Sequence, residues 1–194
     1  MFSLIAGKVI ISVMDFVVVL HVSAALLLIV AGLAKIFKPL PTAELLASFK
    51  LPKVAAAVVV IGVVETAVGV SALVFGGPLW AAVIGIFYVG FIGVVGRALA
   101  TGARSCGCFG RADAPPSWIH VLGNALFAAV SFVASLGRTP AQVMADQPAG
   151  GIGFVLGAGV IAGLALVAFT ALPEAFAARG GTGSSVEFRI NSED

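Results

Sequence analysis

Charged residues are scarce in this chain, with 11 Lys and Arg and 9 Asp and Glu among 194 residues. The hydrophobic fraction of 60% and the mean hydropathy of +1.15 lie far outside the range of soluble globular domains and exclude that class. A net charge of +2 leaves no basic surface for a nucleic acid. The sequence also lacks a Walker motif, a dinucleotide fingerprint, HExxH and a nucleophile elbow. The missing motifs exclude the site chemistries that they carry, and the composition indicates a membrane protein.

Apolar residues gather in five runs, each long enough to cross a hydrocarbon core of ~30 Å at ~1.5 Å per residue. The runs are about Val9–Ala34, Val54–Phe75, Leu79–Ala100, Trp118–Leu136 and Gly151–Leu172. We therefore predict an all-α, polytopic integral membrane protein.

A secretory signal is the competing interpretation of the first run, because Lys8 precedes it and Val22–Ala24 resembles a cleavage site. The run continues to Ala34, however, well beyond the ~7–15 residues of a signal peptide's apolar core, and Asp15 interrupts it. We therefore expect a helix of the mature protein.

The first connection between runs predicts a short helix. Its apolar residues share one helical face and its charged residues lie opposite, a pattern typical of a helix at the membrane interface. The apolar residues are Leu45, Leu46 and Phe49, and the charged ones are Glu44 and Lys50.

Further signals mark how the runs begin and meet. Gly76–Pro78 predicts a tight turn between the second and third runs. Ser117 is a candidate N-cap for the fourth run. In the fifth run, glycines spaced for close helix approach lead us to expect packing within the monomer. These glycines are Gly153, Gly157, Gly159 and Gly163.

The placement of Lys and Arg predicts the orientation. If all five runs span, one side holds nine of these residues near the helix ends, and the other holds only Lys8 and Arg138. The nine are Lys35, Lys38, Lys50, Lys53, Arg97, Arg104, Arg111, Arg179 and Arg189. We predict a multi-pass protein of the inner (plasma) membrane, with the N-terminus outside and the C-terminus and cysteine loop in the cytoplasm.

The sequence contains two cysteines, Cys106 and Cys108, in the loop between the third and fourth runs. In an extended strand the Cα atoms of residues i and i+2 are ~6–7 Å apart, at the long end of the disulfide range. A positive φ at Gly107 would instead turn the chain and bring the two sulfurs together. Because so small a ring would be strained and easily reduced, the pair indicates redox exchange rather than structural cross-linking. The alternative is two small buried apolar side chains.

Arginines flank the cysteine pair. Arg104 and Arg111 would favour a thiolate over a thiol if their side chains fold back, and they are otherwise interfacial cations at a helix end. Metal binding is a rival interpretation of the pair. Together with His120 it offers three ligands where a closed zinc site needs four, so we expect no metal site, with a Cu(I) or partner-completed site as the alternative.

Ionisable residues inside the runs are costly and mark candidate functional positions. The candidates are His21, Glu65 and Arg97. One interpretation is that they hydrogen-bond one another. The other is a proton path or quinone site, because oxidation of a dithiol releases two protons and two electrons that need an acceptor. His120 is either a base for a thiolate or an interfacial histidine beside Trp118.

Several of these features together resemble the MauE family, membrane proteins of the wider DoxX-like group that are associated with methylamine utilisation and thiol redox. The residues are Ala31-Gly32-Leu33-Ala34-Lys35, Pro39, Leu51-Pro52, Glu65 and above all Cys106-Gly107-Cys108-Phe109-Gly110, followed by a serine-led helix with Asn124. The resemblance covers about residues 10–140. It implies a four-helix bundle that forms or transfers disulfides for a partner, often a thioredoxin-like protein.

We therefore expect a DoxX-like four-helix membrane domain over residues 1–140, an additional transmembrane helix over 141–173 and a flexible polar tail over 174–194. The predicted function is thiol–disulfide exchange between the Cys106–Cys108 pair and a thioredoxin-like or other protein partner, which makes the chain a candidate oxidoreductase. The alternatives are a non-enzymatic assembly factor for a redox complex and a metal-delivery protein. No cofactor is certain, and a quinone is the candidate.

Overall fold

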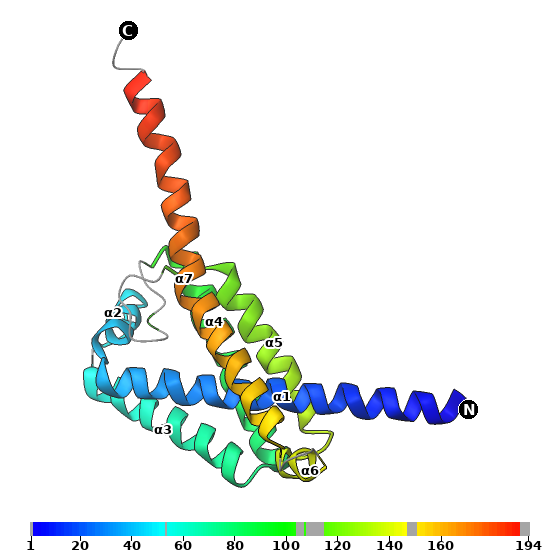
Figure 1. Cartoon of the computed structure of the whole chain (residues 1–194). Helices are drawn as coiled ribbons and strands as arrows, with labels where there is room; N and C mark the ends of the chain where they lie inside the picture. Colours follow the sequence, from blue (N-terminus) through cyan, green and yellow to red (C-terminus); the bar gives the residue numbers. More distant parts are fainter. Residues whose placement is uncertain (1, 53, 104–106, 108–114, 147–150, 191–194) are drawn as a thin grey trace.

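The structure, a computed structural model, describes residues 2–52, 54–103, 107, 115–146 and 151–190. Every regular element in these ranges is an α-helix, which confirms the all-α expectation. The helices are α1 (Phe2–Phe37), α2 (Leu40–Ser48), α3 (Ala55–Val74), α4 (Gly77–Thr101), α5 (Trp118–Ala134), α6 (Pro140–Ala145) and α7 (Ile152–Ile190) (Figure 1).

Four of the described helices are long and apolar enough to cross a membrane. The four segments are Val13–Phe37, Ala55–Val74, Gly77–Thr101 and Ile152–Pro173. α5 is also apolar but has 17 residues, or about 25 Å, slightly less than a hydrocarbon core of ~30 Å. The chain is thus a multi-pass helical membrane protein, and the fifth span and the orientation stay predictions.

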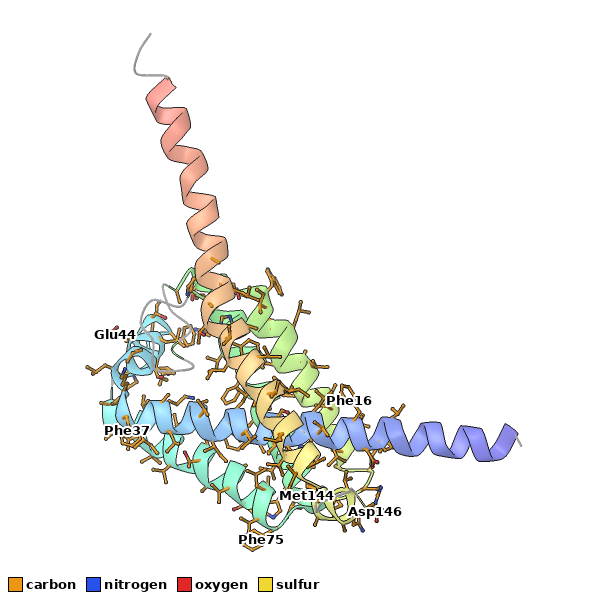
Figure 2. All side chains as sticks on the ribbon, in the orientation of Figure 1. Phe16, Phe37, Glu44, Phe75, Met144 and Asp146 are labelled. Carbon is orange, nitrogen blue, oxygen red and sulfur yellow. The ribbon has the colours of Figure 1, made fainter. Side chains whose placement is uncertain are left out.

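Large apolar side chains cover much of the outside of the bundle. Phe37 and Phe75 are 78% and 74% exposed and point away from the other helices (Figure 2). Exposed apolar surface on this scale is what a surrounding lipid bilayer would cover.

α1 and α3 approach so closely that their backbones are in contact. A Cβ on Gly32 would lie 2.6 Å from the carbonyl oxygen of Gly62, and a Cβ on Gly62 would lie 2.6 Å from the carbonyl oxygen of Gly32. Small residues are the usual means of such close packing between membrane helices. The contact also brings Lys35 of α1 next to Glu65 of α3.

α3 and α4 are joined by a turn in which Gly76 and Gly77 have φ values of 60° and 89°, which confirms the expected tight turn. Farther along α4, the hydroxyl of Tyr88 donates a 2.8 Å hydrogen bond to the carbonyl oxygen of Ala24 in α1. The ring of Tyr88 also packs against Phe127 of α5, with 5.3 Å between ring centroids. Tyr88 therefore joins three helices at the centre of the bundle.

α2 is the short helix expected in the first connection. Leu45 and Phe49 are buried against Ala98 of α4, whereas Lys50 is exposed and so is Glu44, which is labelled in Figure 2. The apolar and charged faces are thus arranged as predicted, with the apolar face turned towards the end of α4.

α7 lies across α1, and its glycines do not make the contacts that were expected. The hydroxyl of Ser23 in α1 donates a 3.0 Å hydrogen bond to the carbonyl oxygen of Ala158 in α7. A Cβ added to any of the four glycines would meet nothing within 4 Å, so the expectation that they pack within the monomer is wrong. The four are Gly153, Gly157, Gly159 and Gly163.

α7 also continues as a helix to Ile190 and projects beyond the bundle (Figure 1). Residues 174–190 are therefore helical where a flexible polar tail was expected. Helix propensity explains part of the difference, because the stretch begins with Glu174-Ala175-Phe176-Ala177-Ala178-Arg179, all of which a helix accommodates easily.

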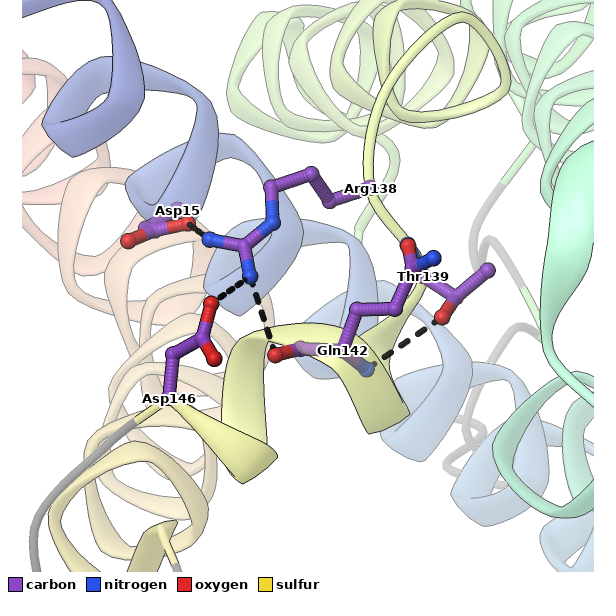
Figure 3. Close-up of polar contacts among 5 residues, drawn as sticks. All are labelled: Asp15, Arg138, Thr139, Gln142 and Asp146. Carbon is purple, nitrogen blue, oxygen red and sulfur yellow. Dashed lines mark hydrogen bonds and ion pairs between the residues drawn. The ribbon is translucent and has the colours of Figure 1, made fainter.

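The end of the bundle that carries α6 is joined to α1 by Arg138 (Figure 3). Its guanidinium donates to Asp15 of α1 at 3.1 Å, to the carbonyl oxygen of Gln142 at 3.0 Å, and to Asp146. Thr139 and Gln142 form a capping box that fixes the start of α6. These contacts hold the connection between α5 and α7 against α1.

Candidate functional site

Gly107, the residue between the two cysteines, lies against the start of α2. Its φ of 62° is in the left-handed region, the conformation predicted for a turn at this glycine. Its carbonyl oxygen accepts a buried 2.6 Å hydrogen bond from the hydroxyl of Thr42. Cys106, Cys108, Arg104 and Arg111 lie outside the described residues, so their roles stay predictions.

The surface that receives Gly107 leaves no room for a side chain. A Cβ at this position would lie 2.9 Å from the Cα of Thr42 and 3.1 Å from the carbonyl oxygen of Pro41. Pro39 and Pro41 bracket the first residue of α2, and their rings fix the φ angles of this segment. A glycine in a left-handed conformation thus packs on a stiff helix start. Sequence reasoning missed Thr42, because no pattern links it to a partner 65 residues away.

Lys35 of α1 and Glu65 of α3 form a buried ion pair. The Lys35 ammonium donates a 2.7 Å hydrogen bond to Glu65 Oε2, and the two side chains are only 6% and 1% exposed. The same ammonium lies over the ring of Phe91, 5.4 Å from its centroid. Glu65 was expected to hydrogen-bond His21 or Arg97 or to belong to a proton path or quinone site, and Lys35 was counted among the cations near the helix ends. The structure instead turns Lys35 inward.

His120 lies inside the bundle at the start of α5. It is 1% exposed, its Nδ1 is 2.8 Å from the hydroxyl of Ser117, and its ring stacks on Phe169 of α7 with 5.6 Å between centroids. The interpretation of His120 as a wet interfacial histidine is therefore wrong, although the neighbouring Trp118 is 70% exposed. Ser117 occupies the predicted N-cap position, but its hydroxyl faces His120 instead of capping the backbone.

A cavity of about 20 Å³ lies between α1, α4, α5 and α7. It lies towards the end of the bundle that carries α2 and Gly107, because Lys35 is in the last turn of α1 and His120 is in the first turn of α5. The lining residues are Leu27, Ala31, Lys35, Tyr88, Phe91, His120, Asn124 and Phe169. The wall is thus mainly aromatic and aliphatic, with a few polar groups among the rings.

Asn124 is the polar group in this wall whose hydrogen bonding is incomplete. Its side chain is 6% exposed and has no hydrogen-bond partner in the part of the chain that the structure describes. Burying an amide without a partner costs roughly 1–3 kcal/mol in proteins, so such groups normally contact water or a ligand. The sequence singled out Asn124 only through the family resemblance.

The other two intramembrane candidates lie apart from this cavity. His21 Nδ1 is 3.1 Å from the hydroxyl of Ser131 in α5, and Arg97 lies over the ring of Phe49, 5.1 Å from its centroid. The expectation that His21, Glu65 and Arg97 hydrogen-bond one another is therefore wrong. His21 instead joins α1 to α5, and Glu65 joins α3 to α1. Arg97 joins α4 to Phe49 at the end of α2.

Within the described ranges, no three His, Cys, Asp or Glu side chains gather as a metal site would require. Because both cysteines lie outside those ranges, a metal site at the cysteine pair stays an alternative.

These features define a class: a multi-pass helical membrane protein with a buried ion pair and a small, mainly apolar cavity at the end of the bundle that carries Gly107. The chain belongs to the MauE family, since the family model described as methylamine utilisation protein MauE matches residues 13–137. The match runs from α1 to the end of α5, includes both cysteines, and stops before α6 and α7. Comparison with curated proteins and with solved structures gave no match.

Proposed function

We propose that this protein exchanges disulfides with a protein partner through Cys106 and Cys108. In the forward step, the thiolate of one cysteine attacks a disulfide of the partner, forms a mixed disulfide and releases one partner thiolate. The second cysteine then attacks the mixed disulfide, which leaves a Cys106–Cys108 disulfide and a reduced partner. The reverse sequence oxidises a partner dithiol, and in either direction two electrons pass between the two pairs of sulfurs.

The conformation of Gly107 is the observation that carries this proposal. A positive φ of 62° at the glycine between the two cysteines supports a turn there, and a turn brings residues i and i+2 closer together than an extended chain does. The hydrogen bond from Thr42 and the tight contact with Pro41 support a turn that is held in place. Isolated buried cysteines that only fill space would not need a fixed glycine between them.

Residues around the cysteines have supporting roles in the proposal. Arg104 and Arg111 would stabilise a thiolate, and His120, at the same end of the bundle as Gly107, is the candidate base. The partner is proposed to carry a dithiol or disulfide in a thioredoxin-like domain, as the family resemblance implies.

Trapping of the mixed disulfide tests the proposal. Cells that express Cys106→Ser or Cys108→Ser are quenched with acid, alkylated and analysed by non-reducing electrophoresis and mass spectrometry. Removal of the resolving cysteine should leave the attacking thiol bound to its partner, so one single variant should accumulate a reductant-sensitive adduct more strongly than the other. The variant with both replacements should give no adduct, and Ser105→Ala, a control beside the pair, should behave like the wild type.

Other results would favour the alternative functions. Absence of an adduct from both single variants, with full activity of the double variant in cells, would contradict the exchange mechanism and favour an assembly factor. Loss of a bound metal from all three variants, with no covalent species, would favour metal delivery.

A further inference from the structure

We propose that the cavity between α1, α4, α5 and α7 binds one internal water molecule, which is hydrogen-bonded to the ammonium of Lys35 and to the side-chain amide of Asn124. This site is built from the packed helices and does not depend on the exchange chemistry proposed above. The water would complete a polar contact that joins α1, α3 and α5.

The volume of the cavity fits a single water. The enclosed space is about 20 Å³. A buried water needs roughly 10–15 Å³ of such space, together with two to four polar partners. Most of the wall is aromatic or aliphatic, so a second water would have few groups to bond to. Size and lining together therefore favour one small hydrogen-bonding molecule.

The buried amide of Asn124 favours a polar occupant. Asn124 is only 6% exposed, lines the cavity, and has no hydrogen-bond partner in the part of the chain that the structure describes. Its amide has two N–H donors and an acceptor oxygen, and burial of these groups without partners is unfavourable. A cavity with a wholly apolar wall stays dry, whereas an amide in the wall attracts water.

Lys35 provides the second partner of the water. A lysine ammonium has three N–H donors. That of Lys35 donates one hydrogen bond to Glu65 at 2.7 Å and lies over the ring of Phe91, 5.4 Å from its centroid. Among the described residues, these two contacts leave donor capacity at the ammonium, and Lys35 lines the same cavity as Asn124. A water there can accept from the ammonium.

One water can serve both groups at once, because it accepts hydrogen bonds through its oxygen and donates two. It would accept from Lys35 and donate to the amide oxygen of Asn124. The result is a chain of hydrogen bonds from Glu65 in α3 through Lys35 in α1 and the water to Asn124 in α5. The water thus extends the buried ion pair to a third helix.

Hydroxyl-radical footprinting tests whether the cavity is hydrated. X-ray radiolysis of a buried water produces a radical that oxidises the side chains beside it, and mass spectrometry measures the rate at each residue. The full chain is purified in detergent, and two buried phenylalanines of α7 are compared. Phe169 is 5% exposed and lines the cavity, whereas Phe154 is 6% exposed and does not. We expect Phe169 to be oxidised about tenfold faster than Phe154, because only Phe169 lies beside the water.

Asn124→Leu tests the role of the amide. Leucine has the same branched shape as asparagine but no hydrogen-bonding atom, and no hydrogen bond to a described residue is lost, so the variant should fold. The oxidation rate of Phe169 should fall to that of Phe154, because the water loses one of its two partners. Leu126→Ala, on the exposed face of the same helix, should keep the wild-type rate at Phe169.

Two outcomes would overturn the proposal. Equally slow oxidation of Phe169 and Phe154 in the wild type would show a cavity that is dry or filled by a lipid group. Fast oxidation of Phe169 that persists in Asn124→Leu would show that water reaches the ring without the amide. The wild-type comparison needs no variant, so it decides the question of hydration even if Asn124→Leu fails to fold.

Discussion

Lys35 and Glu65, on two helices that lie within the membrane-spanning bundle, form a 2.7 Å ion pair with side chains 6% and 1% exposed. The contact between Gly32 and Gly62 lets α1 and α3 approach closely enough for the pair to form. Lys35 also lines the cavity between α1, α4, α5 and α7. The ion pair therefore connects the contact between α1 and α3 with the wall of this cavity. A charge in a bilayer is costly alone, and the pairing of these two residues offsets part of that cost.

We predict that breaking the ion pair destabilises the protein more than replacing both partners. Lys35→Met leaves a buried carboxylate without its partner and should reduce the free energy of unfolding by about 3–5 kcal/mol. Combining Lys35→Met with Glu65→Leu should restore much of this loss, because no charge then remains buried. Unfolding in detergent, followed by circular dichroism, gives the comparison. Equal stability of the wild type and Lys35→Met would contradict the prediction.

The sequence predicted the features that depend on local pattern. Apolar runs gave the helices, Gly76–Pro78 gave the turn, and the alternating faces of Leu45 and Glu44 gave α2. These signals lie within a few residues of one another, so periodicity and turn chemistry suffice to detect them.

The cavity could not be predicted in the same way. From the sequence, Lys35 is interpreted as an interfacial cation because it follows the end of an apolar run. Only the packing of α1 against α3 shows that its side chain contacts Glu65. His120 and Phe169 stack although they belong to helices far apart in the sequence. Contacts of this kind depend on how helices pack, which the apolar pattern of one chain does not specify. The α7 glycines show the opposite error, since their spacing suggested contacts that the described structure does not contain.

Gly62 and Gly157 provide a matched test of which glycines matter for packing. Gly62→Leu should destabilise the protein by about 1–3 kcal/mol or more, because the new side chain would collide with the backbone of α1 at Gly32. Gly157→Leu should change stability little, since a Cβ there meets nothing within 4 Å. Thermal unfolding of both variants in the same detergent measures the difference. Comparable losses in the two variants would show that Gly157 has a contact of its own, such as a second membrane helix.

Cysteine labelling tests the orientation and the number of spans. Ser3→Cys and Ser184→Cys are introduced singly into protein that carries Cys106→Ser and Cys108→Ser, and intact cells are treated with a membrane-impermeant maleimide. The Lys and Arg distribution predicts labelling at position 3 from outside and protection at position 184 until the cells are opened. The reverse pattern would overturn the orientation. Labelling of both positions from outside would show an even number of spans, in which case the 17-residue α5 does not cross the membrane.

The hydroxyl of Thr42 provides the sharpest test of how the cysteine turn is held. Thr42→Val keeps the shape of the side chain but removes the donor to the carbonyl oxygen of Gly107. Loss of this hydrogen bond should destabilise the turn at Gly107 by about 1 kcal/mol. If the anchored turn favours the disulfide, this loss should shift the Cys106–Cys108 equilibrium in a glutathione redox buffer about five- to tenfold towards the dithiol.

Thr42→Ser keeps the donor and should retain the wild-type equilibrium, which separates loss of the hydrogen bond from loss of packing. Gly107→Ala should shift the equilibrium in the same direction as Thr42→Val and further. Its Cβ would lie 2.9 Å from the Cα of Thr42, and the φ of 62° is unfavourable for alanine. The fraction of disulfide is measured by acid quench and differential alkylation at fixed buffer potential. An identical equilibrium in Thr42→Val, Thr42→Ser and the wild type would show that the Thr42–Gly107 contact does not control the cysteine pair, even if all three proteins are equally stable.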